Sequence, residues 1–319
     1  MRILFVKTSS LGDVVHHCPA VSEAARRVPG ARIDWVVEET FAQIAALHAA
    51  VQRVIPVAVR RWRAMPLAAA TWREARAFRA ELRRERYDCV IDSQGLLKSA
   101  LIAALAHGPR HGYDRASARE PLAARFYQYR HPVALALHAV ERNRALTGAA
   151  LGYASEGACE YGLRAGDEAA DEPALAVRAP FAILLTMTSR ADKLWPEERW
   201  RALGAGLAAR GLQCVLPWGS EEEKARCARI AAAIDGAVVP PRMQLAELAR
   251  AMARAHRVIG VDTGLTHVAA ALELPVLGLY CGSDPALTGL HGSVRARNLG
   301  AAGRPPSVDD VLAALESVR

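Results

Sequence analysis

The sequence lacks the features that mark a membrane-spanning or disulfide-stabilised protein. It has no run of about 18 uncharged apolar residues, and the apolar segment at 3–6 is far too short for a signal peptide. The six cysteines are scattered and include no C-x-x-C pair, which is typical of reduced thiols in a cytosolic protein. We therefore expect a cytoplasmic location, and association with a membrane surface is left open.

Several motifs of nucleotide and metal enzymes are missing as well. No G-x-G-x-x-G follows the first strand-like segment and no G-x-x-x-x-G-K-[ST] occurs, so a Rossmann dehydrogenase and a P-loop NTPase are disfavoured. The ten histidines form no H-E-x-x-H and no Cys/His pair at zinc spacing, so we expect no structural metal. Aromatic residues reach only 6% and no nucleic-acid-binding motif appears, so nucleic acid is not an expected partner.

Negative charge is scarce in the first half of the chain. Residues 1–160 carry 23 Lys and Arg against 15 Asp and Glu, a net charge of +8, whereas residues 161–319 carry 18 of each. A general preference for Arg would explain the number of basic residues but not this asymmetry, which predicts an anionic partner for the first half. Only four of the 41 basic residues are Lys, and Lys7, Lys98 and Lys193 are candidates for tight phosphate contact.

What the sequence does contain is an alternation of strand-like and helical segments, which predicts an α/β fold with parallel sheets. A stretch rich in Gly, Pro and acidic residues at 163–180 breaks the alternation, so we expect a linker there and domains at 1–165 and 166–319. We expect the last helix to be able to pack back on the first domain. The predicted strands are 2–7, 32–37, 53–58, 88–92, 181–186, 213–217, 237–239, 257–261 and 275–280, and the main predicted helices are 14–27, 67–86, 97–106, 197–210, 221–234, 244–254 and 307–318.

One segment of the second half carries most of the functional signal. The strand-like run that ends at Val261 is followed by Asp262-Thr263-Gly264-Leu265-Thr266-His267 and then by a helical pattern. A strand that passes through such a turn into a helix directs free backbone N–H groups at the helix N-terminus, where phosphate or carboxylate binds. His267 is either a ligand-binding residue there or an ordinary buried histidine.

The first strand-like segment ends in a similar turn, Lys7-Thr8-Ser9-Ser10-Leu11-Gly12-Asp13. Asp13 is either a general base or a carboxylate that stabilises the helix dipole. The segments Arg60-Arg61-Trp62-Arg63 and Asp92 to Lys98 also follow strands, and the Arg cluster is either an anion site or a solvated loop. Since ligands bind at the carboxyl ends of parallel strands, we expect a ligand held between the two domains.

Two turns of the second half add phosphate- and ribose-binding candidates. Thr188, Ser189 and Lys193 follow a strand and can contact phosphate oxygens, or they form an ordinary hydrophilic loop. The acidic run that ends at Glu223 opens a predicted helix, where such residues usually complement the dipole but can also hold a ribose diol.

Taken together, these segments resemble the bacterial lipopolysaccharide heptosyltransferase I family, part of glycosyltransferase family 9. The resemblance extends over essentially the whole chain. It rests on Lys7-Thr8-Ser9-Ser10-x-Gly12-Asp13-Val14, Asp34-Trp35-Val36-Val37-Glu38-Glu39, Val54-Ile55-Pro56-Val57 with Arg60-Arg61-Trp62-Arg63, Asp92-x-Gln94-Gly95-Leu96-x-Lys98-Ser99, Ala118-Arg119-Glu120-Pro121-Leu122, Trp195-Pro196-Glu197-Glu198 and Val261-Asp262-Thr263-Gly264-Leu265-x-His267.

The resemblance implies a GT-B fold, two Rossmann-like domains facing across a cleft, the first binding the acceptor and the second the ADP-sugar donor. It implies transfer of L-glycero-D-manno-heptose from ADP-heptose to the first Kdo of Kdo2-lipid A, with inversion and without a metal or other cofactor. The resemblance also implies that the protein lies peripherally on the cytoplasmic face of the inner membrane. The alternatives left open are heptosyltransferase II, another GT-B nucleotide-sugar enzyme such as an epimerase, and a non-catalytic nucleotide-binding protein.

Carried over residue by residue, the family pattern assigns Asp13 as the catalytic base. The donor-binding residues that it implies are Thr188, Ser189, Lys193, Glu223, Met243, Asp262, Thr263, Gly264, Leu265 and His267. We expect the anionic acceptor to bind the basic half, at Lys7, Ser10, Gly12, Arg60, Arg61, Arg63, Gln94, Lys98 and Arg119. The sequence departs from the pattern at Ser189, where Thr is frequent, and at Ala191, where an acid is frequent, which concerns only the fine donor affinity.

Overall fold

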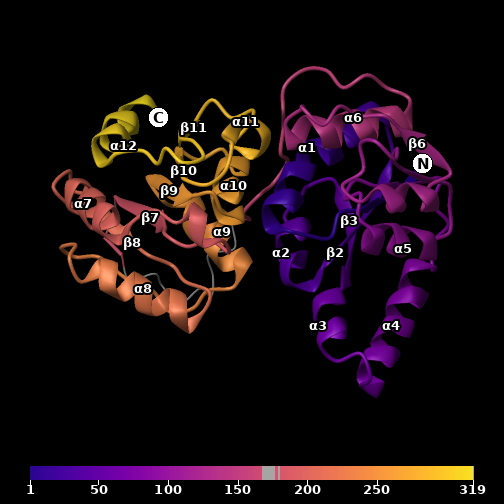
Figure 1. Cartoon of the computed structure of the whole chain (residues 1–319), viewed down its shortest axis with the longest axis horizontal. Coiled ribbons are helices and arrows are strands. Elements are labelled where there is room, and N and C mark those ends of the chain that lie inside the picture. Colours follow the sequence, from indigo (N-terminus) through magenta and orange to yellow (C-terminus); the bar gives the residue numbers. More distant parts are fainter. Residues whose placement is uncertain (167–176, 179, 319) are drawn as a thin grey trace. The chain divides into compact units, whose positions relative to one another are not determined.

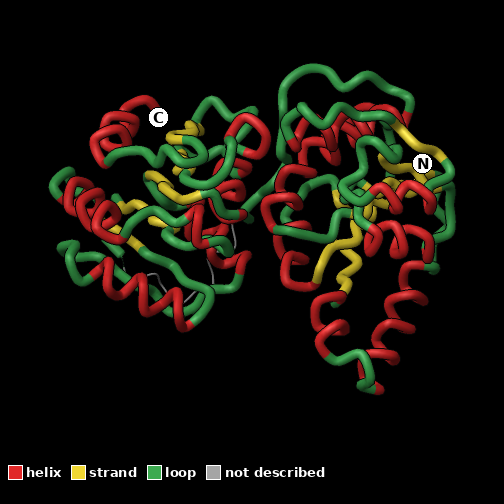
Figure 2. Tube along the Cα trace, viewed as in Figure 1, coloured by secondary structure: helices red, strands yellow, loops and turns green. Residues whose placement is uncertain are grey.

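Two parallel sheets form the framework of the chain, one in each half. The computed structural model describes residues 1–166, 177–178 and 180–318, and the chain divides into two compact units, Met1–Leu163 and Arg164–Arg319. Within each unit the strands lie inside and the helices surround them (Figure 1, Figure 2). Part of the predicted linker, residues 167–176 and 179, lies outside the described residues.

The first unit contains a six-stranded sheet in the order β3-β2-β1-β4-β5-β6, with parallel neighbours throughout. Its strands are β1 (Arg2–Val6), β2 (Arg32–Glu38), β3 (Val51–Val57), β4 (Cys89–Asp92), β5 (Arg110–Tyr113) and β6 (Tyr129–His131). Its helices are α1 (Leu11–Arg27), α2 (Ala42–Ala46), α3 (Val59–Ala64), α4 (Ala69–Leu82), α5 (Leu97–Leu105) and α6 (Ala139–Leu151), with 3₁₀ turns at Glu39–Phe41 and Pro121–Phe126.

Apolar side chains cover both faces of this sheet, as a parallel sheet requires. On one face, Leu4 and Val90 of the strands pack with Phe78 of α4 and Ile102 of α5. On the other face α1 buries Val14, Val15 and Cys18, among others. A buried ion pair between Glu23 and Arg144, with 2.9 Å between Oε2 and Nε, joins α1 to α6.

The second unit contains a five-stranded parallel sheet in the order β11-β10-β9-β7-β8. Its strands are β7 (Phe181–Leu185), β8 (Gln213–Val215), β9 (Arg257–Val261), β10 (Val276–Tyr280) and β11 (Ala296–Gly300). Its helices are α7 (Glu197–Ala208), α8 (Glu221–Ala231), α9 (Leu245–Ala253), α10 (Gly264–Ala271), α11 (Pro285–Thr288) and α12 (Val308–Ala314), with 3₁₀ turns at Ala191–Lys193 and Leu315–Ser317.

The strand orders place one topological switch point in each sheet. In the first unit the chain proceeds outward from β1 through β2 to β3 and from β4 through β5 to β6, so the reversal lies between β1 and β4. In the second unit it lies between β7 and β9. Ligands of open parallel sheets bind outside the carboxyl ends of the strands at this point. The predicted turns after β1, β7 and β9 stand at these positions.

The α/β fold and its parallel sheets were predicted correctly, but several elements were not. Strands β5, β6 and β11 and helix α6 were not predicted from the sequence. The predicted strand at 237–239 is wrong, because Val238 forms only an isolated bridge with Val215. Short, polar strands near a sheet edge, such as the Tyr-Arg-His of β6, bury too little to show an apolar period.

The C-terminal helix, for which packing on the first domain was left open, contributes to the core of the second unit. Val311 and Ala314 are buried there with Trp195 and Trp200. The indole N–H of Trp195 donates to the carbonyl of Pro306 at 3.0 Å, which fixes the segment leading into α12. Within the described ranges, no helix combines the length and the apolar content needed to cross a membrane.

Candidate functional site

The turn after β1 is held by the turn after β4, as expected for neighbours at a switch point. The side-chain oxygen of Gln94 accepts hydrogen bonds from the backbone N–H groups of Thr8 and Ser9, each at 3.1 Å. Lys98 Nζ donates to Ser9 Oγ at 3.0 Å. Gln94 and Lys98, predicted as acceptor-binding residues, therefore shape the loop that leads to Asp13.

Asp13 lies in the first turn of α1 with its side chain 14% exposed. Its Oδ2 accepts from the backbone N–H of Ser10 at 3.0 Å, and its Oδ1 accepts from Arg119 at 2.8 Å. Burial raises the pKa of Asp13, but the positive charges of Lys7 and Arg119 outweigh it and hold the pKa at about 2. The carboxylate is therefore ionised at neutral pH.

Lys7 is buried, and its charge interacts with that of Asp13. Its Nζ donates to the carbonyl of Ser93 at 2.8 Å and to the side-chain oxygen of Asn143 at 3.2 Å. Burial lowers the pKa of Lys7 to about 8, and the charge of Asp13 opposes this shift only in part. Asn143, which also donates to the carbonyl of His16 at 3.0 Å, was missed by the sequence analysis. It comes from the unpredicted helix α6, and no nearby motif marks it.

A glycine turn after β4 brings Arg119 to Asp13. The buried Asp92 Oδ1 accepts from the N–H of Gln94 at 2.9 Å and from the N–H of Gly95 at 3.3 Å. Gly95 has φ +68°, and a Cβ there would lie 3.3 Å from the backbone N of Arg119. The carbonyl of Gly95 then accepts from the N–H of Glu120 at 2.9 Å. A glycine is required at 95 both for the turn and for this close approach.

The remaining predicted acceptor residues fall into two groups. Ser10 and Gly12 lie at the start of α1, beside Asp13. Arg60, Arg61 and Arg63 lie on α3, and they are not equivalent. Arg61 is paired with Glu39 at 2.9 Å and with Glu74 at 2.8 Å, whereas the guanidinium of Arg60 stacks over the Phe41 ring. Arg61 therefore has much of its charge neutralised, which the sequence analysis did not foresee.

The second switch point gathers a cluster around Asp262, a buried residue directly after β9. Its Oδ2 accepts from Lys193 Nζ at 2.7 Å and from Ser283 Oγ, and its Oδ1 lies 3.4 Å from His267 Nε2. Burial raises the pKa of Asp262, but hydrogen bonds from His267, Lys193 and Ser283 outweigh it and leave the pKa far below its usual range. Asp262 is thus a permanent anion that fixes the positions of its partners.

Several predicted donor residues surround this cluster. Thr263 is the N-cap of α10, and Gly264 and Leu265 form its first turn, so their N–H groups lie at the positive end of the helix. Thr188 donates to the carbonyl of Asp262 at 2.9 Å, which joins the turns after β7 and β9. Ser189 is exposed in the same turn. Thr266 of α10 packs so closely on β9 that a Cβ at Gly260 would lie 2.2 Å from its hydroxyl.

Two further donor predictions lie on other elements. Glu223 lies in the first turn of α8, as the dipole-complementing alternative requires, and it accepts from the N–H of Gly219 at 2.6 Å. Met243 is half-buried and precedes α9. The structure therefore brings Lys193, Asp262 and His267 into one cluster with Ser283 but shows no direct contact of Glu223 or Met243 with it.

Ser283 was missed by the sequence analysis, although a signal was present. It follows β10, and the polar Gly282-Ser283-Asp284 turn stands at the carboxyl end of a strand next to β9. A Cβ at Gly282 would lie 2.5 Å from the backbone oxygen of Asp192, so this glycine lets the two turns approach. Within the residues that the structure describes, no three His, Cys, Asp or Glu side chains gather as a metal site would require. The predicted independence of metal stays a prediction.

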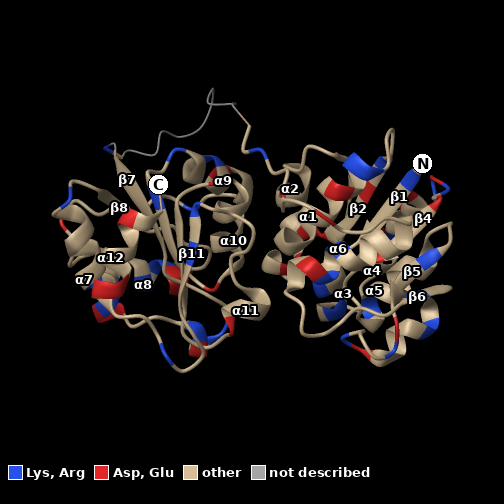
Figure 3. Cartoon of the chain, turned by 90° about the horizontal axis from the view of Figure 1, so that it is seen from above, with Lys and Arg blue, Asp and Glu red and all other residues tan. Residues whose placement is uncertain are grey.

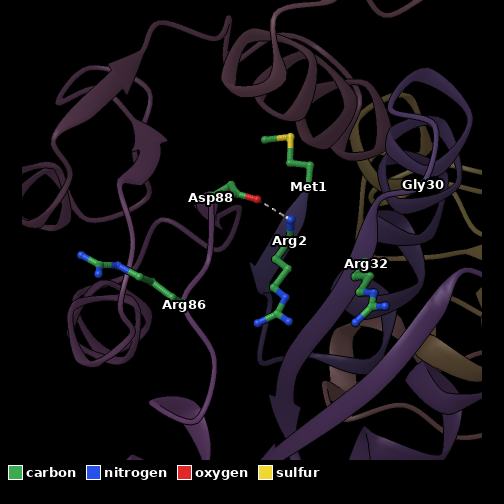
Figure 4. Close-up of a pocket in the computed structure, with 6 residues that line it drawn as sticks. All are labelled: Met1, Arg2, Gly30, Arg32, Arg86 and Asp88. Atoms are coloured by element: carbon green, nitrogen blue, oxygen red, sulfur yellow. Dashed lines mark hydrogen bonds between the residues drawn. The ribbon is translucent and has the colours of Figure 1, made fainter.

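A pocket of about 450 Å³ lies at the opposite end of the first sheet. Arg2, Arg32, Arg86 and Asp88 line it together with Met1 and Gly30 (Figure 4). Arg2 pairs with Glu85, and its backbone N–H donates to Asp88 at 2.7 Å. Because ligands bind at the carboxyl ends of parallel strands, this basic pocket at the amino ends is not part of the candidate site.

Comparison with known proteins gives a consistent result. Residues 75–309 match the model of glycosyltransferase family 9 (heptosyltransferase). The chain belongs to this family. Lipopolysaccharide heptosyltransferase 1 of Salmonella typhimurium is 48% identical over 297 residues, which cover 92% of each chain. The same-named protein of Pseudomonas aeruginosa is also 48% identical, over 92% of this chain and 82% of the relative.

A solved structure, E. coli heptosyltransferase WaaC with ADP, matches with a TM-score of 0.89 and 44% identity, covering 99% of this chain and 98% of that chain. The structure of E. coli heptosyltransferase II matches with a TM-score of 0.75 but only 22% identity, which supports the fold alone. The chain is therefore a glycosyltransferase with a GT-B fold, a heptosyltransferase I of lipopolysaccharide biosynthesis, and the resemblance found in the sequence is confirmed.

Proposed function

We propose that this heptosyltransferase moves L-glycero-D-manno-heptose from ADP-heptose to the first Kdo of Kdo2-lipid A, with inversion and without a metal or other cofactor. The acceptor binds the first unit and the donor the second. E. coli heptosyltransferase WaaC, 43% identical over 99% of this chain, has been solved with ADP-2-deoxy-2-fluoro heptose, which supports an ADP-sugar donor. Two observations carry the proposal: an ionised, partly exposed Asp13 at the switch point of the first unit, and an anion-binding turn at the switch point of the second unit.

Asp13 is the general base for the acceptor hydroxyl. Each carboxylate oxygen can accept about two hydrogen bonds. Oδ1 receives one from Arg119, so a hydroxyl can still reach this atom. The proton then passes to Asp13 while the hydroxyl oxygen attacks the anomeric carbon. A single displacement, in which the hydroxyl oxygen attacks the face opposite the departing ADP, inverts that carbon.

The second unit stabilises the leaving diphosphate. Negative charge grows on the ADP oxygens as the glycosidic bond breaks, and preorganised donors are the effective stabilisers of such charge. The N–H groups of 263–265 and the Lys193 ammonium supply these donors, and Asp262 holds Lys193 in place. A neutralised Lys–Asp pair binds an anion less tightly than a lone Lys, which favours release of ADP after transfer.

The proposed acceptor is an anionic lipid, so the enzyme works as a peripheral protein on the cytoplasmic face of the inner membrane. The net charge of +8 on residues 1–160 supports binding of such an acceptor by the first unit. Lys and Arg lie on both units, but in the second unit they are matched by Asp and Glu (Figure 3).

The decisive experiment mixes the protein with ADP-heptose and Kdo2-lipid A, without added metal and with EDTA, and measures ADP release. We expect ADP release only when both substrates are present. We also expect NMR to show a product whose anomeric configuration is opposite to that of the donor. ADP release that stops with EDTA would contradict metal independence. Binding of ADP-heptose without any release on addition of acceptor would support the non-catalytic alternative instead.

A further inference from the structure

The α3–α4 hairpin of the first unit exposes large apolar side chains at its tip. Met65, Leu67 and Trp72 are 52%, 94% and 58% exposed, respectively. The hairpin extends away from the sheet of its unit (Figure 1, Figure 2). Met65 and Leu67 lie in the turn between α3 and α4, and Trp72 lies in the first turn of α4. Clustered exposed apolar residues of this size mark an interaction site rather than ordinary surface.

The base of the hairpin is firmly built, so the tip is held in this exposed position. The Trp62 ring of α3 packs edge-on against Phe78 of α4, with centroids 5.9 Å apart. Its indole N–H donates to Glu74 at 2.9 Å, and Thr71 Oγ1 donates to the carbonyl of Met65 at 2.8 Å. These bonds fix the turn from both sides.

Basic residues follow the apolar tip along one side of α4. Trp72, Arg76, Arg79 and Arg83 succeed one another at spacings of four, three and four residues, which places them on one helical stripe. All four are exposed. Among the residues that the structure describes, Arg76, Arg79 and Arg83 form no ion pair.

The acids of α4 do not neutralise this stripe. Glu74 pairs with Arg61 at 2.8 Å, and Glu81 pairs with Arg53 at 2.8 Å and with Arg84 at 3.1 Å. The hairpin thus directs its acids toward other partners and leaves an apolar tip followed by uncompensated positive charge. We call Met65, Leu67, Trp72, Arg76, Arg79 and Arg83 the docking surface.

We propose that the docking surface binds the interface of a bilayer that carries anionic phospholipids. The inference rests on the proposed function, because a lipid acceptor requires the enzyme at a membrane. The spacing fits a bilayer: at 1.5 Å per residue, Arg76 lies about 6 Å behind Trp72 along the helix. The headgroup region of one leaflet is about 5–8 Å thick, so an inserted Trp72 places Arg76 at the phosphates. Trp prefers this boundary, and Arg stems extend through apolar surroundings while the guanidinium reaches the headgroups.

The test is sedimentation of the whole protein with vesicles of phosphatidylcholine alone or with about 30% phosphatidylglycerol, without lipid A. We expect binding that requires phosphatidylglycerol and weakens with salt. Arg76→Glu/Arg79→Glu should weaken it at least about 20-fold, since each basic residue near an anionic surface contributes about fivefold. Leu67→Ser/Trp72→Ser should weaken it about tenfold or more.

Matched controls come from the second unit. Val294, 97% exposed, gives Val294→Ser as a control for the apolar change. Arg210 and Arg254, both exposed, give Arg210→Glu/Arg254→Glu with the same change in net charge. Both controls should bind vesicles like the unchanged protein. Circular dichroism melting confirms that each variant is folded before binding is measured.

Three results would overturn the inference: binding of the hairpin variants equal to that of the controls, no binding of the unchanged protein, or equal binding to neutral vesicles. A mass in solution that falls from dimer to monomer in Leu67→Ser/Trp72→Ser would assign the tip to a second copy instead. A separate assay tests the proposed function, which predicts ADP release with a deacylated, water-soluble acceptor. Absence of that release would contradict the proposed function and not the docking surface. The hairpin variants should keep that release unchanged, while losing activity on acceptor embedded in anionic vesicles.

Discussion

Asp13 and Asp262 occupy similar positions but are used differently. Each follows a strand at a topological switch point and lies at the start of a helix. Asp262 is surrounded by Lys193, His267 and Ser283, which occupy both of its oxygens. Both oxygens of Asp13 also accept hydrogen bonds, from the N–H of Ser10 and from Arg119, but its side chain is 14% exposed, against 7% for Asp262. The first carboxylate can meet a substrate, whereas the second organises the residues around it.

The net charge of the groups around Asp13 also differs from that around Asp262. Lys7 and Arg119 both act on Asp13, so the first site keeps a positive excess that suits an anionic acceptor. At the second site the charges of Lys193 and Asp262 cancel, and the helix N–H groups provide the attraction for a diphosphate. Burial and hydrogen bonding, not residue type, therefore decide what each aspartate does.

The largest effect should come from Asp13→Asn. Loss of a general base lowers kcat about 10²- to 10⁴-fold, while the donor KM should stay near its original value. Steady-state ADP release measures both. Asp310 is a matched control, because it accepts from the N–H of Ser307 at 2.9 Å at the start of α12, as Asp13 does from Ser10. Equal losses in Asp13→Asn and Asp310→Asn would reduce Asp13 to a helix-capping residue.

Lys193→Ala and Ser283→Ala should separate charge from positioning at the second site. Lys193→Ala removes a charge-assisted contact and should raise the donor KM about 10- to 100-fold without changing the acceptor KM. Ser283→Ala removes one neutral donor to Asp262 and should raise the donor KM only about 2- to 10-fold. If Ser283→Ala raised the donor KM as much as Lys193→Ala, the position of Asp262 would depend on the Ser283 hydroxyl.

Residues that stand in a strand–turn–helix pattern or in a family motif were picked out from the sequence, and residues outside such patterns were not. Asp13, Asp262 and His267 stand in turns whose local pattern reveals strand, glycine and helix in order. Asn143 reaches Lys7 across a sequence separation of 136, from a helix whose buried residues include Asn and Arg. The pairing of Arg61 with Glu39 and Glu74 depends on how α3 packs, which no local pattern encodes.

The pH dependence of kcat/KM for the acceptor and for the donor should distinguish the two sites. Because burial lowers the pKa of Lys7 to about 8, its ammonium loses a proton as the pH rises through 8. One of the two positive charges that act on Asp13 is then lost while Arg119 stays charged, and kcat/KM for the acceptor should fall by up to about tenfold per pH unit above 8. Lys7→Met should be slower at pH 7 but level between pH 7 and 9. A fall in the donor kcat/KM alone would place the titrating group in the second unit.

The smallest effect should distinguish two arginines of the same helix. Arg63 is exposed, and Arg63→Gln should raise the acceptor KM about two- to fivefold, with the donor KM unchanged. Arg61 is held by Glu39 and Glu74, so Arg61→Gln should change the acceptor KM less and instead slightly lower the melting temperature, because exposed ion pairs contribute little to stability. Thermal unfolding and acceptor titrations measure the two quantities. Equal effects of both variants on the acceptor KM would mean that the Arg61 ion pairs open when acceptor binds, so that all the basic residues of α3 face the same anion.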